Sequence, residues 1–113
     1  MKQLQNILYK VHLKQVLGTT DQIVAGIAID SRKVQANYVF VAINGEKTNG
    51  HHFIEKAIEL GASVIICEVL PNELAAGITY LQVDNTHEAV AVIVHQFYNE
   101  PSAKIKLVGV TGT

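Results

Sequence analysis

The sequence of 113 residues is long enough for one domain with its own core, since 49% of its residues are hydrophobic. Its formal net charge of −1 argues against a protein that binds nucleic acid or a membrane surface, because both rely on clustered positive charge. No apolar run approaches the roughly 20 residues of a membrane span. The N-terminus lacks the apolar core of a signal peptide, so we expect a cytoplasmic protein. The single cysteine, Cys67, lies in an apolar run that predicts a buried thiol.

Helices and strands are predicted to alternate along the chain. Helices are indicated where apolar residues recur every three or four positions, and strands where branched apolar runs lie between turn residues. In chain order, the predicted elements are a short helix through Leu4, Ile7, Leu8 and Val11, a strand over 23–29 weakened by Gly26, a strand over 38–43, a helix from Phe53 that stops at Gly61, strands over 63–67 and 79–83, a helix ending near Tyr98, and a last strand over 105–110. This alternation predicts an α/β fold, a small mixed sheet of about five strands with helices on both faces.

The last of these helices has a clear start. Asn85 is a predicted N-cap, and Glu88 three residues later completes a capping-box pattern. The apolar residues expected to face the core from this helix are Ala89, Val90, Ile93, Val94 and Phe97.

Two polar segments flank the most apolar predicted strand, and together they resemble a binding site. Asp30, Ser31 and Arg32 follow the strand over 23–29, and a polar loop with two Asn-Gly pairs spans 44–50. The glycines allow close backbone approach, while Ser31 and Arg32 offer hydrogen bonds and positive charge to a small anionic ligand. As alternatives, Asp30 is a turn or cap acceptor, and Arg32 closes an ion pair with Asp30 or with a neighbouring acid.

The end of the sequence resembles the beginning of a phosphate-binding loop. A predicted strand runs directly into Thr111, Gly112 and Thr113, but the Gly-Lys-Ser/Thr part that would carry the chemistry does not follow. One interpretation is a natural terminus with a Gly-Thr turn. We favour the other, a chain cut at a domain boundary, with residues 1–102 forming one domain and 103–113 beginning a nucleotide-binding domain.

The combination of these motifs is specific, although each one alone is weak. The motifs are Asp30-Ser31-Arg32, Val39 to Ala42, Gly45, Asn49-Gly50-His51, Phe53-Ile54, Ala57, Gly61-Ala62, Phe97-Tyr98, Pro101-Ser102 and Leu107 to Thr113. From Ile27 onward, the chain resembles the N-terminal domain of the Mur ligases, and within that family the branch of UDP-N-acetylmuramoyl-tripeptide synthetases, MurE.

The resemblance implies a parent enzyme of peptidoglycan precursor synthesis. Such an enzyme uses ATP and Mg²⁺ to join meso-diaminopimelate or L-lysine to UDP-N-acetylmuramoyl-L-alanyl-D-glutamate. Its N-terminal domain holds the UDP end of this substrate, its central domain binds ATP and magnesium, and its C-terminal domain selects the amino acid. Only the first domain is present, so we expect no catalysis, no cofactor and no metal site in this chain alone. Its expected partners are the substrate and the two missing domains, with neither nucleic acid nor membrane.

The family's contacts to the UDP moiety correspond to two groups of residues here. Ile29 and Ser31 lie at the strand end, where Ile29 could pack on the base or sugar and Ser31 could donate a hydrogen bond to it or to a phosphate. Glu46, Lys47 and Thr48 lie in the following loop, where Lys47 could sit against the diphosphate. A carboxylate beside a diphosphate is unfavourable unless it points to the ribose or to solvent, so whether Glu46 contacts the ligand through its side chain or its backbone N–H stays open. Gly112 and Thr113 correspond to the start of the ATP loop.

Two other functions remain open on sequence grounds. The chain could be the same domain of MurF, the ligase that adds D-alanyl-D-alanine, although Phe97-Tyr98 and Gly109 to Thr113 favour MurE. It could also be a stand-alone α/β binding module. A reading frame that continues into Asn-Gly-Lys-Thr would exclude the stand-alone module.

Overall fold

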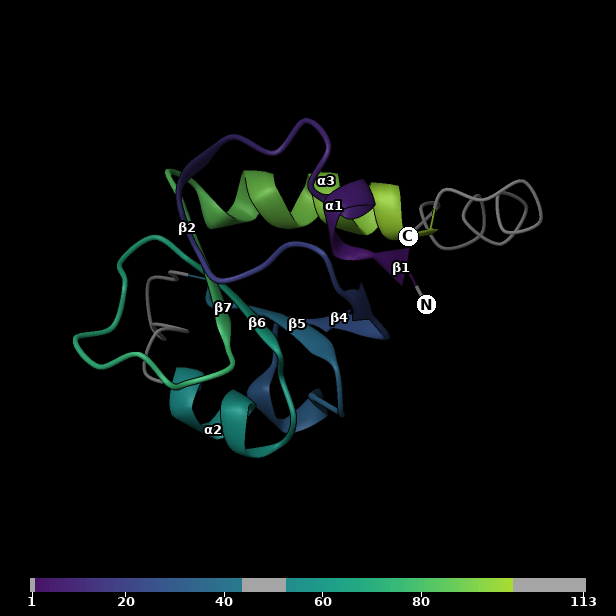
Figure 1. Ribbon diagram of the computed structural model, residues 1–113. Coiled ribbons are helices and arrows are strands. Elements are labelled where there is room, and N and C mark those ends of the chain that lie inside the picture. The colour runs from purple at the N-terminus through teal and green to yellow at the C-terminus, as the bar shows by residue number, and fades with distance from the viewer. Residues whose placement is uncertain (1, 44–52, 99–113) are drawn as a thin grey trace.

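A computed structural model describes residues 2–43 and 53–98, and its centre is a five-stranded sheet in the order β2-β7-β6-β5-β4 (Figure 1). The strands are β2 (Leu13–Leu17), β4 (Gly26–Ala28), β5 (Tyr38–Val41), β6 (Val64–Cys67) and β7 (Thr79–Val83). The last four are mutually parallel, and β2 pairs antiparallel with β7. A separate antiparallel pair joins β1 (Lys2–Gln3) to β3 (Ile23–Val24). The predicted fold class, a mixed sheet of about five strands, is therefore confirmed, although β2 was not among the predicted strands and the predicted strand over 105–110 lies outside the described residues.

Helices cover both faces of the sheet, as predicted. On one face lie α1 (Leu4–Ile7) and α3 (Thr86–Tyr98), and on the other lie α2 (Ile54–Glu59) and the 3₁₀ turn η1 (Ser31–Lys33) (Figure 1). Because successive residues of a strand point to opposite faces, β5 supplies both layers: Val39 and Val41 pack in the α1–α3 layer, and Phe40 packs in the α2 layer. All three are fully buried.

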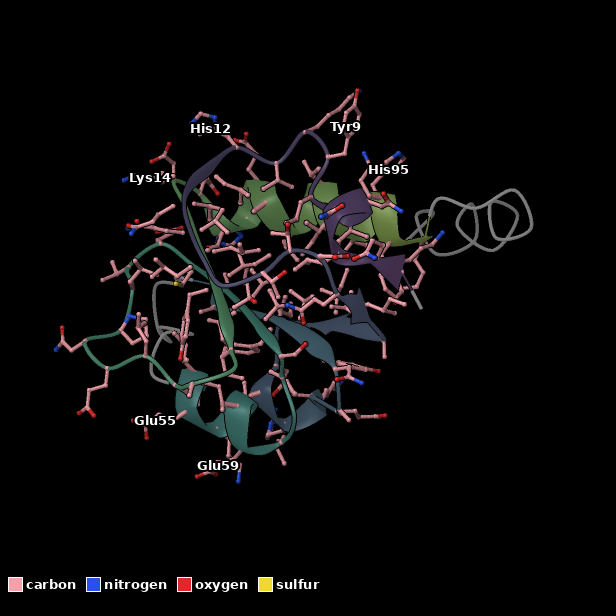
Figure 2. All side chains as sticks on the ribbon, in the orientation of Figure 1. Tyr9, His12, Lys14, Glu55, Glu59 and His95 are labelled. Carbon is pink, nitrogen blue, oxygen red and sulfur yellow. The ribbon has the colours of Figure 1, made fainter. Side chains whose placement is uncertain are left out.

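The boundaries of α2 and α3 follow the predicted signals more closely than their faces do. The N–H of Glu88 donates to Asn85 Oδ1 at 3.0 Å, which confirms the N-cap of α3. Ala89, Ile93 and Phe97 are buried as predicted and Val90 packs against the same layer, but Val94 is exposed. Phe53, expected on the core face of α2, is also exposed. Figure 2 shows Glu55 and Glu59 of α2 pointing away from the sheet.

The segment over 23–29 is two short strands instead of the one predicted. It divides at Ala25, whose N–H donates to the carbonyl of Asn37 at 2.8 Å. The preceding part pairs with β1 and the following part with β5. At Gly26, an added Cβ would lie 2.6 Å from Cζ of Tyr38, so the absent side chain leaves room for the aromatic ring.

The N-terminal region also differs from the prediction. The first helix ends at Ile7, and Lys10 shortly afterwards has a φ of 73°, which a helix cannot contain. The strand β2 was not predicted, because its residues are exposed or half-buried and carry no strong apolar alternation. Within residues 2–43 and 53–98, no helix is long and apolar enough to cross a membrane.

Candidate functional site

The carboxyl ends of the four parallel strands lie at one edge of the sheet, which is where open α/β sheets bind ligands. Ile29 to Arg32 leave the end of β4, and Ala42 and Ile43 leave the end of β5. Because β4 and β5 are hydrogen-bonded neighbours, these two segments begin side by side. The predicted contacts Glu46, Lys47 and Thr48 lie outside the described residues, as do Gly112 and Thr113.

Asp30 and Arg32 lock the turn that follows β4. Asp30 Oδ1 accepts hydrogen bonds from the backbone N–H of Arg32 at 2.9 Å and from its Nε at 3.1 Å, while Nη2 of Arg32 donates to Oδ2 at 2.9 Å. These hydrogen bonds lower the pKa of the Asp30 carboxyl from 3.8 to about 2. Asp30 is therefore a cap acceptor and Arg32 its ion-pair partner, as the structural alternative in the sequence predicted.

Ile29 and Ser31 have different environments around this turn. Ile29 is 59% exposed and available to a ligand, whereas Ser31, the first residue of η1, is only 6% exposed. A hollow of about 690 Å³ lies beside β4, lined by Ile27, Ala28, Ile29, Asp30, Lys33, Gln35 and Tyr38. Ser31 does not line it. The structure thus brings Ile29 to the hollow and places Ser31 next to it in a buried position.

Three residues that line the hollow were not singled out from the sequence: Lys33, Gln35 and Tyr38. Lys33 adds a second positive charge next to Arg32, and Tyr38 contributes an aromatic ring from the start of β5. One signal could have identified Tyr38 as a residue of this hollow: a glycine paired with an aromatic residue, since Gly26 lies opposite Tyr38 in the register of β4 and β5. That pairing is visible only once the two strands are aligned.

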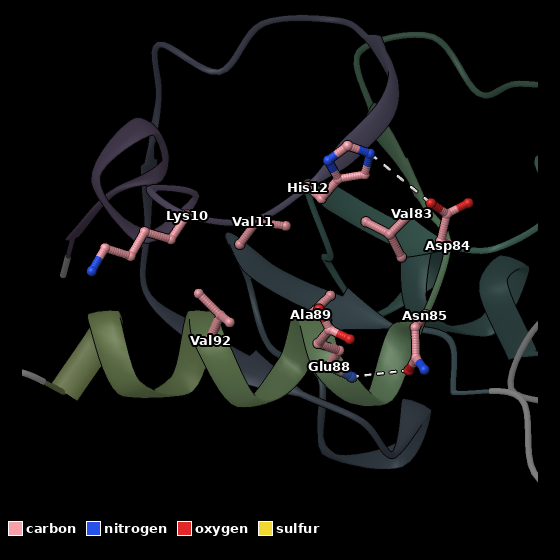
Figure 3. A pocket seen from close by; sticks show the side chains of 9 residues that line it. All are labelled: Lys10, Val11, His12, Val83, Asp84, Asn85, Glu88, Ala89 and Val92. Carbon is pink, nitrogen blue, oxygen red and sulfur yellow. Dashed lines mark hydrogen bonds and ion pairs between the residues drawn. The ribbon is translucent and has the colours of Figure 1, made fainter.

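A second hollow, of about 200 Å³, lies between the segment before β2 and the start of α3 (Figure 3). Asp84 faces it at the end of β7, with its carboxylate 3.4 Å from Lys14 Nζ and 4.0 Å from His12 Nε2. All three side chains are largely exposed. Such pairs are weak in water, so this hollow has no arrangement that would hold a small ligand firmly.

Among the described residues at the carboxyl edge, Glu68 is an acid that serves the fold. The carboxylate of Glu68, directly after β6, accepts hydrogen bonds from the N–H and the Oγ1 of Thr86, both at 2.9 Å. Thr86 is fully buried at the start of α3. Glu68 therefore joins β6 to α3.

The described residues contain neither a reactive thiol nor a cluster of metal-binding side chains. Burial raises the pKa of the Cys67 thiol to about 11, so it remains protonated at neutral pH. Cys67 is fully buried, which confirms the prediction of a core thiol. Among residues 2–43 and 53–98, no three His, Cys, Asp or Glu side chains are grouped to hold a metal ion.

Comparisons of the sequence with known proteins give consistent results. A sequence profile described as "Mur ligase family, catalytic domain" matches residues 23–98. The chain is 44% identical over 110 residues to a UDP-N-acetylmuramoyl-L-alanyl-D-glutamate–2,6-diaminopimelate ligase of Bacteroides fragilis, and 46% identical over 112 residues to one of Cytophaga hutchinsonii. These alignments cover 97% and 98% of the chain but only 23% of each relative.

Two solved structures of similar fold are both of proteins named MurF. MurF from Acinetobacter baumannii matches with a TM-score of 0.63 and 26% identity, over 79% of this chain and 19% of that one. MurF ligase from Thermotoga maritima, in complex with ADP, matches with a TM-score of 0.53 and 28% identity, over 61% of this chain and 16% of that one.

Proposed function

Since this chain belongs to the Mur ligase family, we propose that it holds the UDP end of a UDP-N-acetylmuramoyl peptide within a MurE-type ligase. The chain spans about a quarter of the length of the curated relatives it matches. The whole enzyme would join 2,6-diaminopimelate to UDP-N-acetylmuramoyl-L-alanyl-D-glutamate at the expense of ATP. The names of the relatives favour diaminopimelate over L-lysine as the added residue.

The observation that supports this proposal best is the carboxyl edge at β4 and β5. Ile29 is exposed there, Ser31 lies beside it, and the Asp30 carboxylate is bound by Arg32 instead of facing a ligand. With Lys33 next in the chain, the turn has two positive charges and one negative charge, which suits a diphosphate. The loop that leaves β5 would add Lys47, Thr48 and the backbone of Glu46.

The MurE assignment is favoured over MurF by the degree of similarity. The relatives named for diaminopimelate addition are 34–46% identical to the chain, whereas the MurF structures that share the fold are 24–28% identical. The similarity to MurF therefore reflects a common architecture, and the sequence is nearer to the enzymes that act one step earlier.

ATP and Mg²⁺ would belong to the rest of the enzyme. In this proposal, residues 1–102 form the substrate domain, and 103–113 begin the ATP-binding domain with Gly112 and Thr113 in its phosphate loop. The lysine that such loops use to hold phosphate is not in this chain. The chain should therefore bind UDP but not Mg-ATP.

Calorimetric titration of the chain tests this division. UDP should bind and Mg-ATP should not, and a dissociation constant for Mg-ATP below roughly 100 μM would contradict the proposal. Ser31→Ala should weaken UDP binding about five- to tenfold, because one hydrogen bond of roughly 1 kcal/mol is lost.

Ser63→Ala supplies the matched control for this titration. Ser63 precedes β6, at the amino ends of the parallel strands, and its Oγ is buried without a hydrogen-bond partner. This variant should bind UDP as the unmodified chain does. Equal losses in both serine variants, or no binding of UDP by the unmodified chain, would contradict the assignment of this edge.

A further inference from the structure

The turn after β4 is held by side chains more than by regular structure. Its 3₁₀ helix has three residues, the usual length of such turns, and so contributes few backbone hydrogen bonds of its own. The backbone contributes hydrogen bonds from the N–H of Lys33 to the carbonyl of Asp30 at 2.9 Å and from Val34 to Ser31 at 3.4 Å. Three further hydrogen bonds join Asp30 to Arg32, at 2.9, 3.1 and 2.9 Å, and span Ser31 from one side to the other.

The Arg32 side chain folds back onto this turn although solvent surrounds it. It is 83% exposed, yet two of its nitrogens engage both oxygens of Asp30. Such a planar, two-point contact fixes orientation as well as charge, which a lysine could not do. The residue enclosed between the two partners is Ser31, and the one directly before them is Ile29.

We propose that Asp30 and Arg32 are positioning residues, which hold Ser31 and Ile29 in the conformation that binds the substrate before it arrives. This inference rests on the proposed function, in which Ser31 and Ile29 contact the UDP moiety. Neither Asp30 nor Arg32 needs to touch the ligand. Their contribution is preorganisation, because a turn that is already ordered loses less conformational entropy on binding.

Positioning and simple charge attraction make opposite predictions for Asp30→Asn. The substitution removes a negative charge, so electrostatics alone would strengthen binding of an anion. Positioning predicts weaker binding, because a neutral amide no longer holds the guanidinium at two points. Arg32→Lys separates the two effects again, since it keeps the charge and loses the two-point contact.

The test measures UDP affinity by calorimetry and the order of the Ser31 amide by NMR relaxation, in the unmodified chain and three variants. Asp30→Asn and Arg32→Lys should each weaken UDP binding on the order of three- to tenfold. In both, the Ser31 order parameter without ligand should fall from about 0.85 toward 0.6. Lys14→Gln is the control, since it breaks the exposed ion pair between Lys14 on β2 and Asp84 after β7, and it should change neither quantity.

The outcomes separate this inference from the function on which it rests. If the unmodified chain fails to bind UDP, the proposed function is wrong. If it binds UDP but Asp30→Asn binds equally or more tightly, the positioning role is wrong and the function stands. A Ser31 amide that remains ordered in both variants would also overturn the positioning role, whatever the affinity.

Discussion

Asp30 is a carboxylate at the proposed ligand-binding edge, and it is unavailable for acid–base chemistry. Both of its oxygens are engaged by Arg32, and the resulting low pKa keeps it ionised at any physiological pH. A charged group in this state neither donates nor accepts a proton during a reaction. The arrangement instead suits a site that recognises a ligand without transforming it.

The pH dependence of Asp30 follows from the direction of this shift. Because the pKa in the folded chain is about 2, below the ordinary 3.8, the ion pair stabilises the fold above the ordinary value. That contribution is lost as the pH falls through about 2. Carbon-detected NMR of the side-chain carboxyl should give a midpoint near 2 in the unmodified chain and a higher midpoint in Arg32→Gln, which loses the guanidinium contacts but keeps the backbone hydrogen bond.

Lys33→Gln is the matched control for this titration. Lys33 also lowers the pKa of Asp30, but it is the last of the contributions and acts only through its charge. Its removal should therefore move the midpoint far less than Arg32→Gln does. Equal midpoints in the unmodified chain and in Arg32→Gln would show that the hydrogen bonds do not form in solution.

At the scale of elements, Gly61 determines how α2 returns to the sheet. Its φ of +119° lies in the region that favours glycine, and an added Cβ would be 2.8 Å from the Cα of Ala36. Its carbonyl also accepts a hydrogen bond from Asn37 at 2.9 Å. The helix therefore ends against the segment that leads into β5.

Gly61→Ala should destabilise the fold by upward of about 2 kcal/mol, because backbone strain and a steric clash act together. Gly77 offers a comparison, since its φ is +81° but an added Cβ would meet nothing within 4 Å. Gly77→Ala should cost only about 1 kcal/mol. Urea unfolding of the two variants measures the difference, and equal losses would mean that the contact with Ala36 relaxes freely.

The elements that could be predicted from sequence are those whose own residues carry the signal. The strand β6 is buried at all four positions and α3 carries its cap, and both were found. The strand β2 was missed because it is an edge strand whose formation depends on pairing with β7. The division of the segment over 23–29 at Ala25 was missed for the same reason. It depends on two different pairing partners, β1 on one side and β5 on the other, which the residue pattern does not show.

The candidate site likewise has a part that the sequence predicts and a part that it does not. The Asp30–Arg32 pair is a local arrangement, so the sequence could present it as an alternative. The hollow beside β4 combines Tyr38 with Ile29 through strand pairing, which residue patterns alone do not show. The burial of Ser31 likewise results from the packing of η1 against α2.

At the scale of the whole molecule, the stability of the fold depends on the inner strands of the sheet and much less on its antiparallel edge strand, β2. Val41 is fully buried in β5, between β4 and β6, whereas Val16 is 42% exposed in the edge strand β2. Val41→Asp should prevent folding, because it places an unpaired charge in the core. Val16→Asp should leave a cooperative thermal transition, measured by circular dichroism, and a cooperative transition in Val41→Asp would contradict the account.

Mapping UDP onto the chain by amide chemical shifts tests the central claim most directly. The proposed function predicts that the perturbed amides cluster at Ile29 to Lys33 and in the loop over 44–50. Ile29 to Lys33 leave the carboxyl end of β4, and residues 44–50 follow Ile43 in the sequence, after the carboxyl end of β5. A cluster elsewhere, for instance around Asn72 to Ile78 beside α2, would show that the ligand does not bind at this edge, even though the chain is a member of the family.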